Sequence, residues 1–91
     1  MMSAQDNMLQ ELQGDVVLVP GETGKRCGGA KVALVTDSGD EYVIIPKGAG
    51  ADLAGYLSAR ISALAVIEER DEELYCIQVR SYRLADDFVD A

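Results

Sequence analysis

Residues 31–45 read KVALVTDSGDEYVII, and this stretch decides the fold of the chain. Two apolar runs, 32–36 and 41–45, flank the turn-forming tetrapeptide DSGD at 37–40. Gly39 can adopt the left-handed backbone conformation that closes a type I turn with a bulge. We therefore predict a β-hairpin, with two strands joined by this turn.

A second hairpin is predicted over residues 61–84, on either side of the acidic turn EERDEE at 68–73. Residues 60–68 and 75–84 each alternate with a period of two, which is typical of strands. One face of each strand is the more apolar: Ile61, Ala63, Ala65 and Ile67 in the first, and Tyr75, Ile77 and Val79 in the second. We expect these faces to line the core.

One more strand precedes the first hairpin. Side chains in residues 12–19 alternate with the period of two that is typical of a strand, and Pro20 ends it. Gly14 inside the strand suits a bulge or a tight bend. The glycine-rich residues 21–29 that follow are predicted to form a loop.

A short helix is predicted between the two hairpins, after Pro46 ends the third strand. Leu53, Tyr56 and Leu57 recur at i, i+3 and i+4, which indicates about two turns of helix over 51–57. A helix this short cannot stand alone, so we expect it to plug the open end of a curled sheet.

Composition bounds the class of protein. With 91 residues, 48% of them hydrophobic and 26% charged, the chain is expected to form one globular domain. No apolar run is long enough to span a bilayer, and we expect no membrane partner. Of the 16 acidic residues, five lie at 68–73 and three in the tail, so the body, with eight acids and seven bases, is nearly neutral.

Five strands in this order, with a helix between the third and fourth, resemble the oligonucleotide/oligosaccharide-binding fold (OB-fold). The phrases KVALVTDSGDEYVIIP, DLAGYLSARISALAVIEE and LYCIQVRSYRL are similar to those of small bacterial OB-fold domains of uncharacterised function. The resemblance implies a mainly β, five-stranded Greek-key barrel over 11–85, with a mobile N-terminal arm at 1–10 and an acidic tail at 86–91. It also implies a binding face on 31–45, flanked by 21–30 and 68–73.

Single-stranded nucleic acid binding would need stacking aromatics and cations on that face. Tyr42 is the only aromatic residue there, and four cations could form a basic edge: Lys25, Arg26, Lys31 and Lys47. The acidic turn opposite would repel phosphates, which disfavours this reading. For Tyr42, packing against its cross-strand neighbour is the favoured alternative, and for the loop cations it is simple solvation.

Two cysteines could pair once or stay reduced, and the compartment is left open, with a preference for the cytoplasm. Export with a signal peptide already removed is a further possibility. Cys27, beside Lys25 and Arg26, has the setting of a reactive thiol, but the chain has no histidine to act as its base. A loop cysteine without a role is the favoured reading.

No cofactor, metal or catalytic activity is expected from the motifs. The loop at 21–26 lacks the spacing and the Ser/Thr of a Walker A phosphate loop. EERDEE lacks the alternating ligands and central glycine of an EF-hand, and a carboxylate in a solvated turn has nothing to raise its pKa for acid or base catalysis.

Leu64 and Val66 fall on the face of their strand opposite the expected core. Outward apolar residues tend to be covered, either by the arm with Met8 and Leu9, by the tail with Phe88 and Val89, or by another protein. The sequence therefore predicts a noncatalytic binding module for a protein partner or for a second copy of the chain. The alternative is single-stranded nucleic acid or another polyanion.

Overall fold

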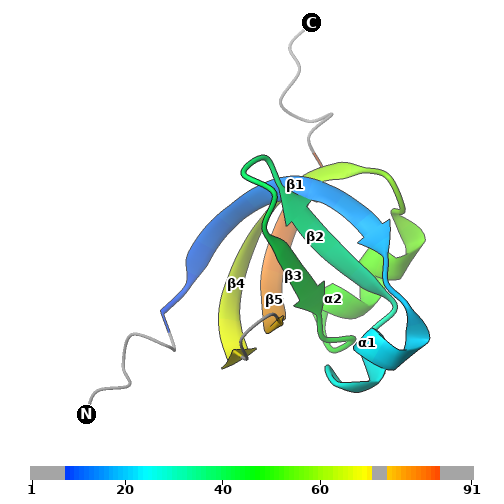
Figure 1. Ribbon diagram of the computed structural model, residues 1–91. Helices are drawn as coiled ribbons and strands as arrows, with labels where there is room; N and C mark the ends of the chain where they lie inside the picture. Colours follow the sequence, from blue (N-terminus) through cyan, green and yellow to red (C-terminus); the bar gives the residue numbers. More distant parts are fainter. Residues whose placement is uncertain (1–7, 71–73, 85–91) are drawn as a thin grey trace, which may run out of the picture.

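The computed structural model describes residues 8–70 and 74–84. Its elements are, in order, β1 (Gln10–Leu18), α1 (Gly21–Lys25), β2 (Val32–Thr36), β3 (Glu41–Ile44), α2 (Ala49–Asp52), the 3-10 turn η2 (Leu53–Gly55), β4 (Arg60–Arg70) and β5 (Tyr75–Leu84). The strands form a closed barrel in the order β1-β2-β3-β5-β4, in which β4 also pairs with β1 (Figure 1). The prediction of a mainly β chain with a five-stranded barrel is confirmed.

The β2–β3 hairpin forms as the DSGD turn predicts. Ala33 pairs with Val43 and Leu34 with Tyr42, while Gly39 has a φ of 94°. The Gly39 N–H donates to the carbonyl oxygen of Thr36 at 2.9 Å, which closes the turn. A glycine is needed here because a side chain would be strained at this φ.

β1 bends sharply so that it can pair with both β2 and β4. Gly14 lies at the bend, opposite Thr36 of β2 and Ile61 of β4. A Cβ atom at Gly14 would collide with the carbonyl oxygen of Val35. The glycine inside this strand therefore marks a close approach between two backbones, as expected from its position.

β4 and β5 are the longest strands and wrap around the barrel. Their antiparallel register shifts between Leu64 and Ala65 and again between Ile67 and Glu69. Such irregularities increase the local twist and let long strands curve. β4 extends to Arg70, past the expected end at Glu68, and the rest of the predicted acidic turn, residues 71–73, lies outside the described residues.

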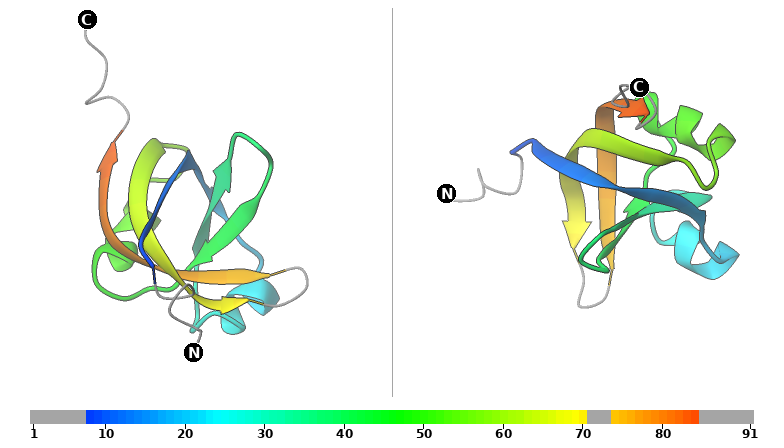
Figure 2. Two further views of the ribbon diagram at one scale, coloured as in Figure 1. Left: turned by 90° about the vertical axis from the view of Figure 1, so that its left-hand side faces the viewer. Right: turned by 90° about the horizontal axis from the view of Figure 1, so that it is seen from above.

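The barrel interior holds the main core, which is formed by Val16, Val32, Leu34, Ile44, Leu53, Ile61, Ala63, Ala65, Ile77 and Val79. Leu53, fully buried, plugs the barrel from η2. The views of Figure 2 show α1 and α2 on the same side of the barrel, away from the segment that leads to the N-terminus. The packed interior accounts for the apolar alternation of the strands.

The predicted helix over 51–57 is wrong in its bounds. Helical structure begins at Ala49 and ends at Gly55, so Tyr56 and Leu57 lie beyond it and are exposed. Gly50 allows the early start, because a Cβ atom at this position would lie only 2.6 Å from the carbonyl oxygen of Ile45. Tertiary packing of glycine, rather than the apolar stripe, sets where this helix lies.

The predicted loop at 21–29 is also wrong in part, because its first five residues form α1. Glu22 in the first turn and Lys25 in the last suit the helix dipole. After the helix, the carbonyl oxygen of Gly24 accepts hydrogen bonds from the backbone N–H groups of Cys27, Gly29 and Ala30. The chain therefore folds back tightly onto the barrel.

Cys27 and Cys76 form a disulfide across 49 positions of sequence. They are 3% and 2% exposed and belong to a second apolar cluster with Ala30, Ala33 and Val43. The reading of Cys27 as a loop cysteine without a role is therefore wrong, and so is its expected exposure. The disulfide fastens the segment after α1 onto the outer face of β2, β3 and β5.

The predicted arm and tail lie largely outside the described residues. Gln10 already belongs to β1, so the barrel begins one residue before the expected boundary at 11. Residues 1–7 and 85–91, with the acidic tail at 86–91, are not among those described. No helix in the described ranges combines the length and the apolar character needed to cross a membrane.

Candidate functional site

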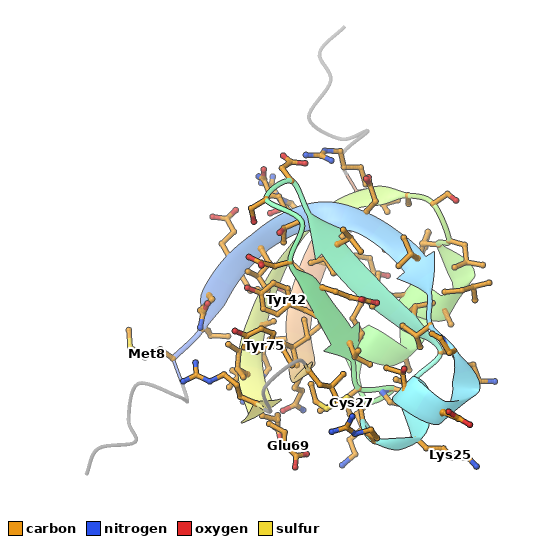
Figure 3. All side chains as sticks on the ribbon, in the orientation of Figure 1. Met8, Lys25, Cys27, Tyr42, Glu69 and Tyr75 are labelled. Atoms are coloured by element: carbon orange, nitrogen blue, oxygen red, sulfur yellow. A yellow bond between two sulfur atoms is a disulfide. The ribbon has the colours of Figure 1, made fainter. Side chains whose placement is uncertain are left out.

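Tyr42 lies at a groove between β1 and the β2–β3 turn, which we call the Tyr42 groove. Its ring packs on that of Tyr75, with the centroids 5.1 Å apart and the planes 35° apart (Figure 3). The other lining residues come from β1 and from the turn: Glu11, Leu12, Gln13, Thr36, Asp37, Ser38 and Asp40. The groove thus combines an aromatic and an aliphatic side chain with three carboxylates.

Hydroxyl groups hold two of these carboxylates in place. The Ser38 hydroxyl donates to Oδ2 of Asp40 at 3.1 Å, and the Ser62 hydroxyl donates to Oε2 of Glu11 at 3.0 Å. Among the described residues, neither carboxylate has a cationic partner. A carboxylate can accept more hydrogen bonds than the single one that each serine donates, so both groups have acceptor positions left for a ligand.

The third carboxylate, Asp37, is paired. One Nη of Arg60 contacts both carboxylate oxygens of Asp37, at 2.8 and 2.7 Å, and the other Nη lies 3.5 Å from Asp15. The hydrogen bond that Arg60 donates to the Asp37 carboxylate is the main cause that raises the pKa of Arg60. Arg60 therefore ties β1, the turn and β4 together at the rim of the groove.

The titration of Tyr42 offers a test of this geometry. Burial of the ring raises the pKa of its phenol above the ordinary 10.0, and the nearby Asp40 and Tyr75 add to the rise. In the unfolded chain the phenol ionises first, so the contribution of Tyr42 to stability is present below pH 10 and is lost as the pH rises through its folded pKa. We expect NMR of the ring carbons to give a midpoint above 10, lowered only partly by Asp40→Asn. A midpoint at or below 10 would contradict the placement.

The predicted basic edge does not surround Tyr42. Lys25 is on α1, away from Tyr42 and Tyr75 (Figure 3), and Arg26 follows it. Lys31 lies just before β2. It is three positions before Leu34, the cross-strand partner of Tyr42, and three residues of strand span about 10 Å. Lys47 follows β3 at its other end from the turn. Lys25, Lys31 and Lys47 therefore do not join Tyr42 in one site, while the backbone of Arg26 contacts Cys76, the residue next to Tyr75.

The predicted interface pair is divided by the structure. Leu64 is 41% exposed on the outer side of β4, as expected, but Val66 is 6% exposed. Both residues were expected to be covered by a neighbouring segment or by a partner, and the two differ in this respect, because Val66 is buried within the described chain while Leu64 is open. Leu64 lies opposite Glu11 of β1 and Ser81 of β5, and it lines a shallow groove with Glu11, Ser62, Ser81, Tyr82 and Arg83. We call this surface the Leu64 face.

Sequence reasoning missed Tyr75, Leu12 and Glu11 as neighbours of Tyr42. Tyr75 reaches Tyr42 through the short parallel pairing of β3 with β5, in which Val43 lies opposite Cys76. The alternation of Tyr75, Ile77 and Val79 along β5 did place Tyr75 on the inner face, and this was the one indication in the sequence that Tyr75 could lie near Tyr42. Alternation, however, does not tell which strands become neighbours.

Metal-ligating side chains do not gather in the part of the chain that the structure describes, since no group of three or more forms within 8–70 and 74–84. Comparison with protein-family models, with curated proteins and with solved structures finds no match to this chain. The Tyr42 groove and the Leu64 face are the two surfaces that carry the chemistry discussed below.

Proposed function

We propose that the chain is a noncatalytic protein-binding module built on an OB-like Greek-key barrel. The strand order β1-β2-β3-β5-β4, the parallel β3–β5 pairing and the short helix between β3 and β4 support this assignment of the fold. An OB-like barrel hosts many unrelated binding functions, so the fold alone does not select a ligand. The surface chemistry must do so.

The exposed Leu64 carries the proposal. It lies between two neighbouring strands rather than at the rim of the sheet, with Glu11 of β1 on one side and Ser81 of β5 on the other. Met8 and Leu9, just before the Gln10–Ala65 pair, are exposed as well. An apolar patch of this kind gains stability when a partner covers it.

A second copy of the chain is the partner that this face fits. In a two-fold symmetric dimer each surface meets itself, so Leu64 of one copy can face Leu64 of the other. Polar side chains, among them Glu11, Ser62 and Ser81, surround this leucine in the groove. An apolar centre with a polar rim is the usual composition of a protein interface.

The Leu64→Glu variant tests this proposal. Sedimentation equilibrium should give an average mass that rises with concentration for the unsubstituted chain, and a dissociation constant about tenfold or more weaker for the variant, because a carboxylate would be buried at the interface. Leu64→Gln introduces a polar group without charge, so it separates loss of the apolar contact from repulsion between the new carboxylate and Glu11. Leu57→Glu makes the same change at another exposed leucine and is the matched control. A monomer at every concentration, or equal effects at positions 57 and 64, would refute the proposal.

Single-stranded nucleic acid is the second candidate, and the Tyr42–Tyr75 ring pair is the observation that favours it. Bases stack on such rings in OB-like domains. Phosphates, however, would meet Glu11 and Asp40 beside the rings, while Lys25 and Lys31 lie elsewhere. Arg70, the cross-strand partner of Tyr75, is the nearest cation by register, and the carboxylates that line the groove with Tyr42 outnumber it, which favours a protein ligand.

We also propose that the chain works in an oxidising compartment. A disulfide that joins distant segments persists where thiols are not kept reduced. This proposal replaces the expectation of the cytoplasm. Titration of free thiols in the protein isolated from its native source should find none after denaturation, and two thiols per chain would contradict it.

A further inference from the structure

We propose that the Tyr42 groove binds an arginine side chain from a basic segment of a partner protein. The inference rests on the proposed protein-binding function, and its surface adjoins the Leu64 face, with Glu11 as the residue that lines both. It names the chemistry of the partner, a guanidinium group next to other positive charges. Three features of the groove support it.

The first feature is uncompensated negative charge in a fixed place. Asp40 from the turn and Glu11 from β1 both line the groove, and Glu11 also lines the neighbouring groove beside Leu64. Each carboxylate accepts a hydrogen bond from a serine hydroxyl and, in the part of the chain described, has no cation in contact. A cationic side chain that reaches Asp40 would make charge-assisted hydrogen bonds, which are stronger than neutral ones, and Glu11 at the edge of the groove adds to the attraction.

The second feature is that the rim already binds a guanidinium group. Arg60 of the chain itself contacts both oxygens of Asp37, which also lines the groove. The turn therefore presents carboxylates in an orientation that a planar guanidinium can use. Arginine suits such sites better than lysine, because its flat group matches a carboxylate and also stacks on aromatic rings.

The third feature is the ring of Tyr42 beside these carboxylates. Tyr75 packs against the ring with a centroid separation of 5.1 Å, so its position is supported from within the protein. A guanidinium over a tyrosine ring is attracted by the negative face of the ring. The ring and the two carboxylates together thus match both the shape and the charge of an arginine side chain.

Fluorescence anisotropy with a labelled peptide of alternating arginine and glycine tests the inference. We expect binding to the intact, oxidised chain that weakens as salt increases. Asp40→Asn should weaken it about tenfold, since a charged partner is lost while the Ser38 hydrogen bond can remain. Glu22→Gln on α1 removes the same net charge far from the groove, so it is the matched control and should change binding less than about twofold. Tyr42→Leu should weaken binding about threefold or more, with Tyr42→Phe close to the original.

The outcomes separate the inference from the function on which it rests. Equal effects of Asp40→Asn and Glu22→Gln would mean that only overall charge attracts the peptide, and would overturn the inference. So would the absence of peptide binding at low salt, or tighter binding of an oligothymidylate than of the peptide. If self-association still depends on Leu64 in any of these cases, the protein-binding function stands. If only self-association fails, the arginine inference is still decided by whether Asp40→Asn weakens peptide binding more than Glu22→Gln does.

Discussion

Replacing Gly14 with alanine is expected to prevent the barrel from folding, or to lower its free energy of unfolding by at least about 3 kcal/mol. The new methyl group would collide with the carbonyl oxygen of Val35, and it would lie 2.6 Å from the Val35 carbonyl carbon and 2.9 Å from Cα of Thr36. These are backbone atoms of β2, so relief requires the strands to separate. Urea unfolding followed by circular dichroism measures the loss.

Gly21→Ala is the matched control for this experiment. A Cβ atom at Gly21 meets nothing within 4 Å, and the residue begins α1, where alanine favours helix. Its effect should stay within about 0.5 kcal/mol. If Gly14→Ala is no more harmful than Gly21→Ala, β1 does not approach β2 as closely as described.

Loss of the Cys27–Cys76 disulfide is expected to have the second large effect. A bridge across 49 positions contributes roughly 4 kcal/mol in the chain-entropy model, because it restricts the unfolded chain. For a domain of this size we expect the midpoint of thermal unfolding to fall by roughly 15 to 25 °C in the Cys27→Ala/Cys76→Ala variant. Alanine is chosen because both positions are buried among apolar side chains.

Reduction provides the internal control. A thiol reductant should lower the thermal midpoint of the unsubstituted chain to near that of the double variant, and it should leave the double variant unchanged. Titration of the thiols confirms that the bridge has been reduced. If the thermal midpoint of the unsubstituted chain is then unchanged, the bridge contributes nothing to stability.

Local patterns in the sequence predicted the hairpins well. The DSGD turn required a residue with positive φ at Gly39, and the structure has one there. The inward faces of β4 and β5 follow from alternation of residues such as Ile61 and Ile77, which are both buried. These features depend on neighbours in sequence, and propensity and periodicity report on such neighbours.

Features that depend on distant contacts could not be predicted in this way. The pairing of Cys27 with Cys76 needs their Cα atoms to lie 5.4 Å apart, which spacing in the sequence does not reveal. α1 is too short to leave a helical period, and it is held by the tight return of the chain at Gly24. Alternation along β4 likewise does not predict that Val66 is 6% exposed while Leu64 is 41% exposed.

The candidate site was predictable only in part. Tyr42 and Leu64 were both singled out by the sequence, one as a lone aromatic and one as an outward leucine. Their surroundings were not, because Glu11 comes from β1 and lies between the two surfaces, opposite Leu64 and along the Tyr42 groove. Closure of the barrel, which brings β1 to both β2 and β4, creates both surfaces at once.

The most direct test of the proposed function is a series of amide NMR spectra of the oxidised chain, recorded at increasing protein concentration without any ligand. The proposal predicts shifts that grow with concentration at Leu64 and at its cross-strand partners Glu11 and Ser81, and that disappear in Leu64→Glu. Spectra that superimpose at all concentrations, or shifts confined to Lys25, Lys31 and their neighbours, would contradict self-association through the Leu64 face.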